Sequence, residues 1–324
     1  MAKADVPCLE IALVFEQRSS YLRVGYSEED CAALPHDGEV EAVFTTLEKL
    51  GHHVTPVPGI QSLVQQLAAG NGMDWDLVFN MAQGLHGPAR EAQVPALLEA
   101  YQIPCTFADA ATMALCQNKA VTKMALNEYK IPNAPFRVIR AEELGADVSR
   151  ITAPLTSYPL FVKLATEGSS KGVESFNKIN NSTELEPAVQ ELKSKFPGQA
   201  IIVESFLPGR EYTVSILGTG RDSRVIGVRE HIWQKLHSTG DIQNSNRSGL
   251  EFASRKCKSS KGDQLVYNDY HDMTDPQVRA ACLVALDAWN AFACRDAGRV
   301  DIRLDADEVD PVPNVLEVGV PICF

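Results

Sequence analysis

Apolar positions in the first third of the chain follow two alternating spacings. Short apolar runs, which predict strands, occur at 9–15, 53–57, 76–80 and 104–107. Apolar residues spaced three to four apart, which predict helices, occur at 38–50, 60–69 and 90–101. Strands that alternate with helices indicate a parallel sheet with helices on its faces. We therefore expect residues 1–108 to form a doubly wound α/β domain.

The pattern changes after residue 108. Helices are predicted at 110–116, 119–129, 182–195 and 275–296, and strands at 136–139, 160–164, 172–176, 201–206, 211–217, 224–229, 299–304 and 314–318. The polar stretch 238–262 predicts a mobile loop. The order of elements predicts two α+β subdomains, 109–200 and 201–324, and a piece such as 109–200 can move as a lid.

Composition narrows the class of protein. The 324 residues include 45% hydrophobic and 22% charged residues, a mixture typical of soluble globular proteins, and carry a net charge of −12. A chain this acidic gives no electrostatic reason to bind nucleic acid or an anionic membrane surface. No apolar run approaches the ~20 residues of a membrane helix, and we interpret the N-terminal MAKADVPCLEIALVF as a first strand, not a signal peptide. The eight cysteines are scattered without metal-binding spacing, which favours a reducing cytoplasm.

The segment YPLFVKLATEGSSKGV at 158–173 is the first candidate for chemistry. It places Lys163 on an apolar strand and follows it with a loop of glycines and serines. A lysine fixed on a strand can bind phosphate oxygens, and a loop of small residues lets backbone N–H groups close over a triphosphate. The spacing matches neither the P-loop nor G-x-G-x-x-G. An ordinary β-turn with a surface lysine is the alternative.

The last two predicted strands bring acidic and basic residues onto one face. Because strand side chains alternate, Arg299, Asp301 and Arg303 share a face, and a hairpin centred near 308–309 pairs Asp301 with Glu317. Two carboxylates on one face can hold Mg²⁺ that bridges nucleotide phosphates. They can also form a surface ion-pair cluster, worth under ~1 kcal/mol.

A second acidic pair lies in VESFLPGREYTV. Glu204 ends one predicted strand and Glu211 begins the next, with Pro208 and Gly209 between them. Carboxylates at strand ends can accept hydrogen bonds from an adenine amino group and from ribose hydroxyls. Solvated strand ends are the alternative.

Taken in order, QNK…TK, FVKLATEGSSKGV, VESFLPGREYTV and GRVDIRLD…VLEV resemble the ATP-grasp carboxylate–amine ligases, and most closely the D-alanine–D-alanine ligases. The stretch from DLVFNMAQGLHG to CQNKAVTK is similar to the link between the first two domains of those ligases. The resemblance extends from about residue 38 to 318. It implies an ATP-grasp fold in which the α/β domain precedes two α+β subdomains that clamp the nucleotide.

The resemblance also implies roles for single residues. Lys119 and Lys163 would bind the α- and β-phosphates, and Lys256, with Lys258 as the alternative, would be a further phosphate lysine. The implied nucleotide-binding residues are completed by Glu167, Gly168, Ser169 and Ser170 over the triphosphate, Glu204, Phe206, Leu207 and Leu316 at adenine, and Glu211 at ribose. Arg299 would stabilise the intermediates, with Lys256 and Ser169 as further catalytic candidates, and His86 would lie beside the substrate. Asp301 and Glu317 would hold Mg²⁺, with Mn²⁺ as the alternative ion.

The reaction implied by the resemblance has two steps. The carboxylate of the first substrate attacks the γ-phosphate of ATP to give an acyl phosphate, and an amine then displaces phosphate to give an amide. Bound lysines and Mg²⁺ would neutralise charge on the transferring phosphoryl group. The expected substrates are two amino acids, or a small carboxylate and an amine, and the expected assembly is a homodimer.

Two departures from the family pattern define the alternative function. Glu16 follows the first strand, but not at the spacing of the family's substrate-binding glutamate. Gly319 stands where the family has a metal-binding asparagine, and the sequence stops before the family's closing loop and helix. The alternative is therefore a truncated, catalytically impaired ATP-grasp protein that binds a nucleotide or a partner without ligation.

Overall fold

The chain divides into two compact units. The computed structural model describes residues 7–143, 147–233, 265–307 and 310–319. Of these, residues up to Ala114 belong to the first unit and residues from Leu115 to Gly319 to the second. Helix α5 (Ala110–Gln117) spans the boundary. The finer division into 1–108, 109–200 and 201–324 stays a prediction.

The first unit is built on a parallel sheet in the order β2-β1-β3. Its strands are β1 (Glu10–Phe15), β2 (His53–Pro58) and β3 (Leu77–Asn80). The prediction of a fourth strand at 104–107 is wrong, because only an isolated bridge joins Cys105 to Val78. Pro104 has no N–H to donate, and Phe107 has a φ of 71°, so the chain leaves the extended conformation there.

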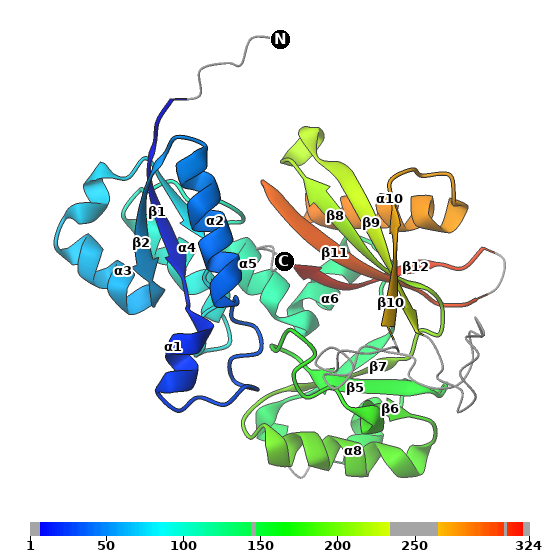
Figure 1. The fold of residues 1–324 in the computed structure, drawn as a ribbon. Coiled ribbons are helices and arrows are strands. Elements are labelled where there is room, and N and C mark those ends of the chain that lie inside the picture. Colours follow the sequence, from blue (N-terminus) through cyan, green and yellow to red (C-terminus); the bar gives the residue numbers. More distant parts are fainter. Residues whose placement is uncertain (1–6, 144–146, 234–264, 308–309, 320–324) are drawn as a thin grey trace, which may run out of the picture. The chain divides into compact units, whose positions relative to one another are not determined.

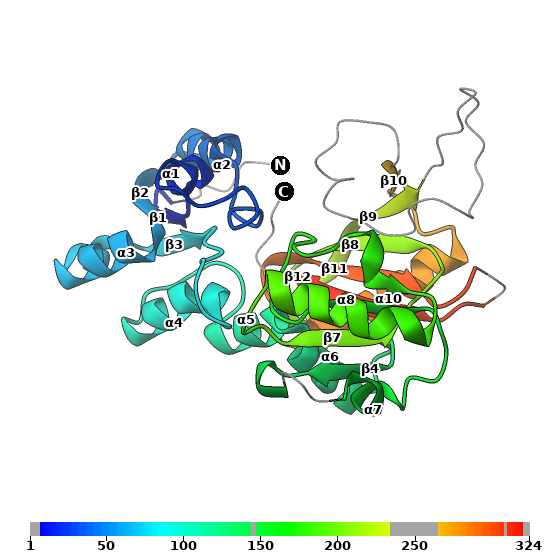
Figure 2. The same ribbon diagram turned by 90° about the horizontal axis from the view of Figure 1, so that it is seen from below.

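Helices cover both faces of this sheet (Figures 1 and 2). On one face, Val40 of α2 (Asp37–Lys49) packs against Leu13 and Phe15. On the other, α3 (Gly59–Ala68) and α4 (Gln93–Ala100) bury leucines such as Leu63 and Leu98 against Val14 and Val78. The doubly wound arrangement expected from the sequence is therefore confirmed. The short helix α1 (Arg18–Arg23), which buries none of its residues, was not predicted.

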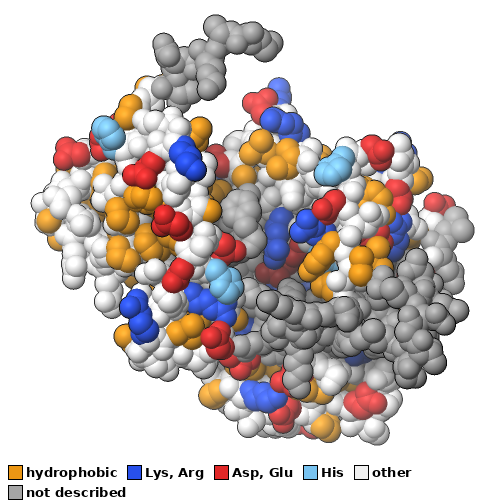
Figure 3. Space-filling model, in the orientation of Figure 1, with side chains coloured by type: hydrophobic (Ala, Val, Ile, Leu, Met, Phe, Trp, Pro, Cys, Tyr) orange, Lys and Arg blue, Asp and Glu red, His pale blue; other side chains and the backbone are white. Residues whose placement is uncertain are grey.

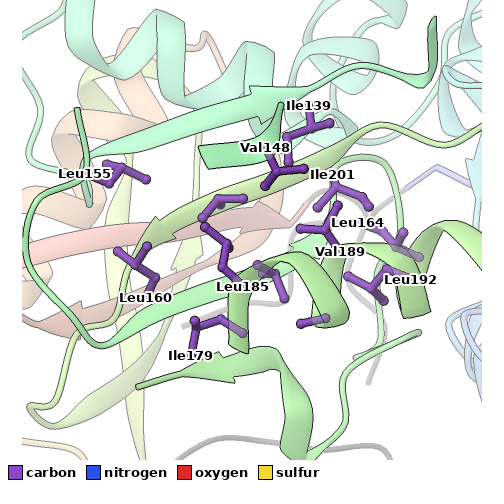
Figure 4. Packing of buried hydrophobic residues seen from close by; sticks show 13 residues of the cluster. Ile139, Val148, Leu155, Leu160, Leu164, Ile179, Leu185, Val189, Leu192 and Ile201 are labelled. Carbon is purple, nitrogen blue, oxygen red and sulfur yellow. The ribbon is translucent and has the colours of Figure 1, made fainter. Parts of the chain in front are cut away.

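The second unit contains an antiparallel sheet in the order β4-β7-β5-β6. Its strands are β4 (Phe136–Ile139), β7 (Ile201–Ser205), β5 (Leu160–Leu164) and β6 (Lys178–Ile179). Helices α7 (Val148–Thr152) and α8 (Ser182–Lys195) pack on one face through the cluster drawn in Figure 4, where Leu185, Val189 and Leu192 of α8 meet the sheet. Ala120 of α6 (Lys119–Glu128) packs beside Ile202 of the same sheet in a separate cluster.

The strand predicted at 172–176 is wrong. Gly172 has a φ of 72°, and a 3₁₀ turn, η4 (Ser175–Asn177), replaces the strand, so that the pairing with β5 begins only at Lys178. The buried Asn177 side chain donates to the carbonyls of Val162, at 2.6 Å, and Gly172, at 3.1 Å. These bonds fix a compact turn where the sequence pattern suggested a continuous hairpin.

A five-stranded antiparallel sheet completes the second unit, in the order β10-β9-β8-β11-β12. Its strands are β10 (Leu265–Tyr270), β9 (Arg224–Trp233), β8 (Glu211–Leu217), β11 (Ala297–Leu304) and β12 (Pro313–Gly319). Strand β10 was not predicted, because most of its side chains are exposed and give no apolar alternation. The 238–262 loop expected from the sequence lies outside the described residues.

Helix α10 (Pro276–Ala291) covers one face of this sheet. Asp275 caps its N-terminus, accepting from the N–H of Gln277 at 2.8 Å. The buried ring of Trp289 lies so close to β11 that a Cβ on Gly298 would be 2.5 Å from it, so glycine is required there. The predicted helix at 275–296 is too long, because Ala293 and Asp296 have φ values of 52° and 64°.

The remaining described helices are single 3₁₀ turns, η1 (Asn71–Asp74), η2 (Arg90–Ala92), η3 (Ala141–Glu143) and η5 (Gly220–Asp222). Within the described part of the chain, no helix combines the length and apolar character needed to cross a membrane. Acidic and basic side chains are interspersed on the face drawn in Figure 3.

Candidate functional site

A pocket opens between the two sheets of the second unit. Its lining residues come from β5 (Phe161, Lys163), the loop before η4 (Val173), β7 and the segment after it (Glu204, Ser205, Phe206, Leu207), β8 (Glu211), β11 (Arg303) and β12 (Leu316). The cavity volume of about 130 Å³ is well above the ~10–15 Å³ that holds one water molecule. Strand alternation explains the lining, because Phe161 and Lys163 are two residues apart on the same face of β5.

One side of the pocket combines an aromatic ring with two cations. The rings of Phe161 and Phe206 lie 6.3 Å apart. The Nζ of Lys178 lies 4.4 Å from the centroid of Phe206, and the guanidinium carbon of Arg303 lies 4.9 Å from it. Burial, and then the nearby Arg303, lower the pKa of Lys178 below its usual value. Phe206 therefore brings an aromatic ring to the pocket wall, with its ring in cation–π contact with Lys178 and Arg303.

Glu204 lies at the end of β7 and binds two lysines. One of its carboxylate oxygens lies 2.5 Å from Nζ of Lys163, and the other lies 2.8 Å from Nζ of Lys123. Burial raises the pKa of Glu204, but the two ammonium groups outweigh it and lower the pKa from 4.5 to about 2. Glu204 is therefore a carboxylate at neutral pH, although only 3% of the residue is exposed.

Glu211 and Arg303 form the other charged pair of the pocket. The guanidinium of Arg303 donates to Oε2 of Glu211 at 3.0 Å. Both are mostly buried, and their strands β8 and β11 are hydrogen-bonded neighbours that place the two residues opposite each other. Burial lowers the pKa of Arg303, and Glu211 opposes that shift. The pair leaves a carboxylate and a cation side by side at the pocket wall.

Lys119 connects the glycine–serine loop to the last strand. It is the first residue of α6, whose N-cap Asn118 accepts from the N–H of Ala120 at 3.1 Å. Its Nζ donates to the carbonyl of Glu167 at 2.6 Å and lies 3.5 Å from the carboxylate of Glu317. The side chain of Glu167 accepts from Nε2 of Gln199 at 2.7 Å. These contacts hold the start of the loop against α6.

The loop itself has an unusual backbone. Ser169 and Ser170 have φ values of 52° and 59°, and Gly172 follows at 72°. Consecutive residues in the left-handed region turn their N–H groups in new directions, and such loops can surround an anion. The N–H of Lys171 donates to the carbonyl of Gly168 at 3.0 Å, so the stretch contains a β-turn, and its binding of a triphosphate stays a prediction.

Asp301 and Glu317 are partners in the register of β11 and β12, as the sequence predicted. A register shift follows Asp301, where the ladder is irregular. Asp301 accepts from the hydroxyl of Thr213 at 2.7 Å, and Thr213 in turn lies 3.1 Å from Nε2 of His231. Arg299 lies 3.6 Å from Asp301.

These two carboxylates can contribute oxygen ligands to a divalent ion, which commonly takes one or two carboxylates and completes its shell with phosphates and water. Both are partly exposed, and each already faces a cation that compensates its charge, Arg299 for Asp301 and Lys119 for Glu317. Groups of three or more acidic, cysteine or histidine side chains suited to a metal do not occur among the described residues. Asp301 and Glu317 therefore fit a divalent ion whose remaining ligands include the phosphate oxygens of a bound molecule.

The candidate residues fall into two groups in the second unit. Lys163, Glu204, Phe206, Leu207, Glu211 and Leu316 line one pocket. Lys119 contacts Glu167 and Glu317, while Arg299 lies beside Asp301. Lys256 and Lys258 lie outside the described residues. The roles assigned to single residues stay predictions.

Sequence reasoning missed four residues that shape the site: Phe161, Lys123, Arg303 and Thr213. Strand alternation was available to find Phe161, which stands two residues before Lys163, and Thr213, which stands two residues after Glu211. Arg303 had been placed on the correct face of β11 but only as part of an ion-pair cluster. Lys123 stands in the motif QNK…TK but was assigned no role, because a lysine on a predicted helix usually points to solvent.

The first unit holds the two remaining candidates. Nε2 of His86 lies 3.1 Å from the hydroxyl of Tyr26. Glu16, only 3% exposed, accepts from the N–H of Gln83 at 2.7 Å. Burial raises the pKa of Glu16, and backbone N–H groups of Gln83 and Gly84 oppose the shift. The carboxylate of Glu16 thus holds the backbone of the segment that carries His86, whose substrate role stays a prediction.

Comparison with known proteins identifies the relatives of this chain. A family model described as D-ala D-ala ligase C-terminus matches residues 125–315, more than half of the chain. A D-alanine–D-alanine ligase of Xanthomonas axonopodis pv. citri is 28% identical over 289 residues, which cover 89% of this chain and 80% of that ligase. One from Gluconobacter oxydans is 28% identical over 266 residues, covering 82% and 77%.

Solved structures of similar fold come from the same group of enzymes. The D-alanine–D-alanine ligase of Bacillus anthracis superposes with a TM-score of 0.66 at 17% identity, covering 96% of this chain and 86% of that one. The VanG D-Ala:D-Ser ligase of Enterococcus faecalis gives 0.64 at 19% identity, covering 97% and 90%. At these identities the likeness establishes the fold, and the predicted ATP-grasp fold is confirmed.

Proposed function

This chain belongs to the family described as D-ala D-ala ligase C-terminus, and on that premise we propose that it is an ATP-dependent ligase that joins two amino acids. The observation that carries the proposal is the pocket between the two sheets. There, Lys163, Glu204 and Glu211 converge with Phe206 and an aliphatic wall. A flat apolar wall, a strand lysine and two acidic side chains are the groups that a purine nucleoside triphosphate requires.

We place the nucleotide base against Phe206, Leu207 and Leu316. The ribose would lie near Glu211, whose carboxylate can accept from hydroxyl groups while it binds Arg303. Lys163 lies at the pocket, where its ammonium group can bind phosphate oxygens. A solved relative from Bacillus anthracis is described as complexed with ATP, which supports ATP as the nucleotide.

We place the phosphates between Lys119 and the loop from Glu167 to Ser170. Lys119 already binds the start of that loop and Glu317, so the loop, α6 and β12 meet at one ammonium group. Asp301 and Glu317 would hold Mg²⁺, or Mn²⁺ in its place, and the ion would neutralise charge on the phosphates. Arg299, beside Asp301, would stabilise negative charge on the acyl phosphate and on the tetrahedral intermediate.

The reaction balances in two steps. A carboxylate oxygen of the first substrate attacks the γ-phosphorus, the bond to ADP breaks, and an acyl phosphate forms. The amine of the second substrate attacks the acyl carbon, inorganic phosphate leaves, and the amine proton passes to solvent or to a nearby base. His86 would lie beside the first substrate. The relatives named D-alanine–D-alanine ligase support D-amino acids as substrates.

One observation favours a second candidate function, nucleotide binding without ligation. Gly319 is paired with Arg299 at the end of β12, where the family pattern has an asparagine that binds metal. Glycine offers no side-chain oxygen, so one ligand of the metal would be lost. Catalysis depends on that ion more strongly than binding of the base depends on it. Loss of the metal ligand would therefore impair ligation more than it impairs nucleotide binding.

Release of ADP separates the two candidates. The chain would be incubated with Mg·ATP and a panel of D- and L-amino acids, while ATP binding is measured by calorimetry. We expect ADP to depend on an amino acid, at a turnover of about 1–10³ s⁻¹. Tight binding of ATP without ADP from any amino acid would contradict ligation and favour the second candidate.

We further propose a homodimer in the cytoplasm. The scattered cysteines fit a reducing compartment, and the proposed ligation needs a supply of ATP. Sedimentation of the full chain tests the dimer, because a single species at the mass of one chain would contradict it.

A further inference from the structure

The buried carboxylate of Glu204 has two ammonium partners with different surroundings. Lys163 lies on β5, lines the pocket and approaches Glu204 to 2.5 Å. Lys123 lies on α6, does not line the pocket and approaches the other carboxylate oxygen to 2.8 Å. The side chain of Lys163 is 12% exposed, whereas that of Lys123 is 1% exposed. Only Lys163 can therefore reach a molecule in the pocket.

Lys123 is fixed where it lies. Its Nζ also donates to the carbonyl of Ala134 at 3.1 Å and lies 5.4 Å from the centroid of the Phe136 ring. Burial, partly offset by Glu204, lowers the pKa of Lys123. Burying a lysine costs free energy unless the lysine is paired, and Glu204 supplies the pairing charge for Lys123.

Lys163 has two competing partners in a nucleotide complex. Without a ligand it is bound to Glu204, and with a nucleotide in the pocket its ammonium group would bind phosphate oxygens. A shift toward phosphate weakens its pairing with a carboxylate that is fully buried. An unpaired buried carboxylate is strongly unfavourable, so Lys163 can turn to phosphate only if Glu204 keeps another cation.

We propose that Lys123 is a positioning residue that keeps Glu204 neutralised, and so leaves Lys163 able to bind the phosphates of a nucleotide. This inference rests on the proposed function, because it assumes that the pocket binds a nucleotide with phosphates. It assigns a task to a residue that touches neither the base nor the phosphates. Lys123 acts through Glu204 on Lys163.

The test measures what the phosphates add to affinity. Dissociation constants for adenosine and for ATP would be measured by calorimetry, and the ratio of the adenosine value to the ATP value reports how much the phosphates add to affinity. In Lys123→Met, we expect that ratio to fall by about 10- to 100-fold, the worth of one charge-assisted hydrogen bond. Adenosine alone should bind as in the wild type, because Lys123 does not line the pocket.

Second variants distinguish this role from a general loss of structure or charge. In Lys123→Met/Glu204→Gln the carboxylate is gone, so the ratio should return toward the wild-type value. Lys163→Met should itself lower the ratio below the wild-type value. Adding Lys123→Met to that variant should lower the ratio little further. Lys193→Met is the control, since Lys193 is also buried, on α8, and its Nζ has no hydrogen-bond partner within the described residues.

Each outcome decides between explanations. Equal ratios in the wild type and Lys123→Met would overturn the inference and leave the proposed function intact. A defect in Lys123→Met that Glu204→Gln does not relieve, or that adds fully to Lys163→Met, would mean that Lys123 acts by direct charge or by structure and would also overturn it. If the wild-type chain bound neither ATP nor adenosine, the proposed function would fail and the inference with it.

Discussion

Glu204 shows how much the environment of one residue changes its chemistry. From the sequence it was a strand-end carboxylate near an adenine amino group, with solvation as the alternative. The structure excludes solvation, because Glu204 is only 3% exposed and each of its carboxylate oxygens pairs with a lysine ammonium group. Its position at the pocket was predicted from a motif, but its lysine partners come from a helix and a neighbouring strand, and no local pattern encodes that pairing.

The depressed pKa of Glu204 predicts a pH dependence of stability. Its folded value, about 2, lies below the unfolded value of 4.5, so its stabilisation is present above pH 4.5 and is lost as the pH falls toward 2. The difference in unfolding free energy between the wild type and Glu204→Gln should therefore shrink, by on the order of 3 kcal/mol, between pH 6 and pH 2. Urea unfolding of both proteins at several pH values measures this difference in unfolding free energy.

Glu186→Gln is the control for that series, because it changes an exposed carboxylate on α8. Its unfolding free energy should follow that of the wild type at every pH. A constant difference between the wild type and Glu204→Gln across the series would show that the two lysines do not depress the pKa of Glu204 in the folded protein.

At the scale of elements, apolar spacing predicted most of the helices and strands, and a hairpin centred near 308–309 correctly paired Asp301 with Glu317. Apolar spacing failed where side-chain hydrogen bonds or backbone conformation determine which element forms or where it ends. Asn177 holds a 3₁₀ turn in place of a strand, and residues with positive φ end α10 before its predicted end. Exposed β10 lacked apolar alternation, and its place in the sheet depends on pairing with β9.

Helix α6 presents Lys119 at its first position, so its cap should matter for binding. Asn118 accepts from the N–H groups of Ala120 and Val121. Asn118→Ala should lower the unfolding free energy by about 1 kcal/mol. It should also weaken ATP binding, because the first turn of α6 positions the ammonium group of Lys119 against the loop. Chemical denaturation and calorimetry measure the two effects.

Asn181→Ala is a matched control for Asn118→Ala. Asn181 caps α8 by accepting from the N–H of Thr183. Like Asn118, Asn181 does not line the pocket. A similar loss of stability with unchanged ATP affinity is expected. Equal losses of affinity in the two variants would show that binding follows overall stability and not the position of Lys119.

At the scale of the whole molecule, the chain consists of two compact units with separate cores. Leu63 and Leu98 belong to the core of the first, and Leu185 and Leu192 to a core of the second. The sequence predicted the parallel-sheet unit from its alternating elements. The packing of two antiparallel sheets around one pocket could not be read from local spacing, because β7 and β8 are consecutive in the chain yet lie in different sheets.

This division predicts where a nucleotide stabilises the chain. Every described residue that lines the pocket belongs to the second unit. ATP at 100 times its dissociation constant should therefore stabilise that unit by about 2.7 kcal/mol, since a ligand bound only to the folded form shifts the equilibrium by mass action.

Hydrogen exchange with and without ATP should show slower exchange for amides of β5 and β7. Amides of β1 and β3 should exchange as before, because without an amino acid nothing in the proposed function requires ATP to contact the parallel sheet. Equal slowing in both units would mean that ATP alone couples them, and the nucleotide site would then have to include residues of the first unit.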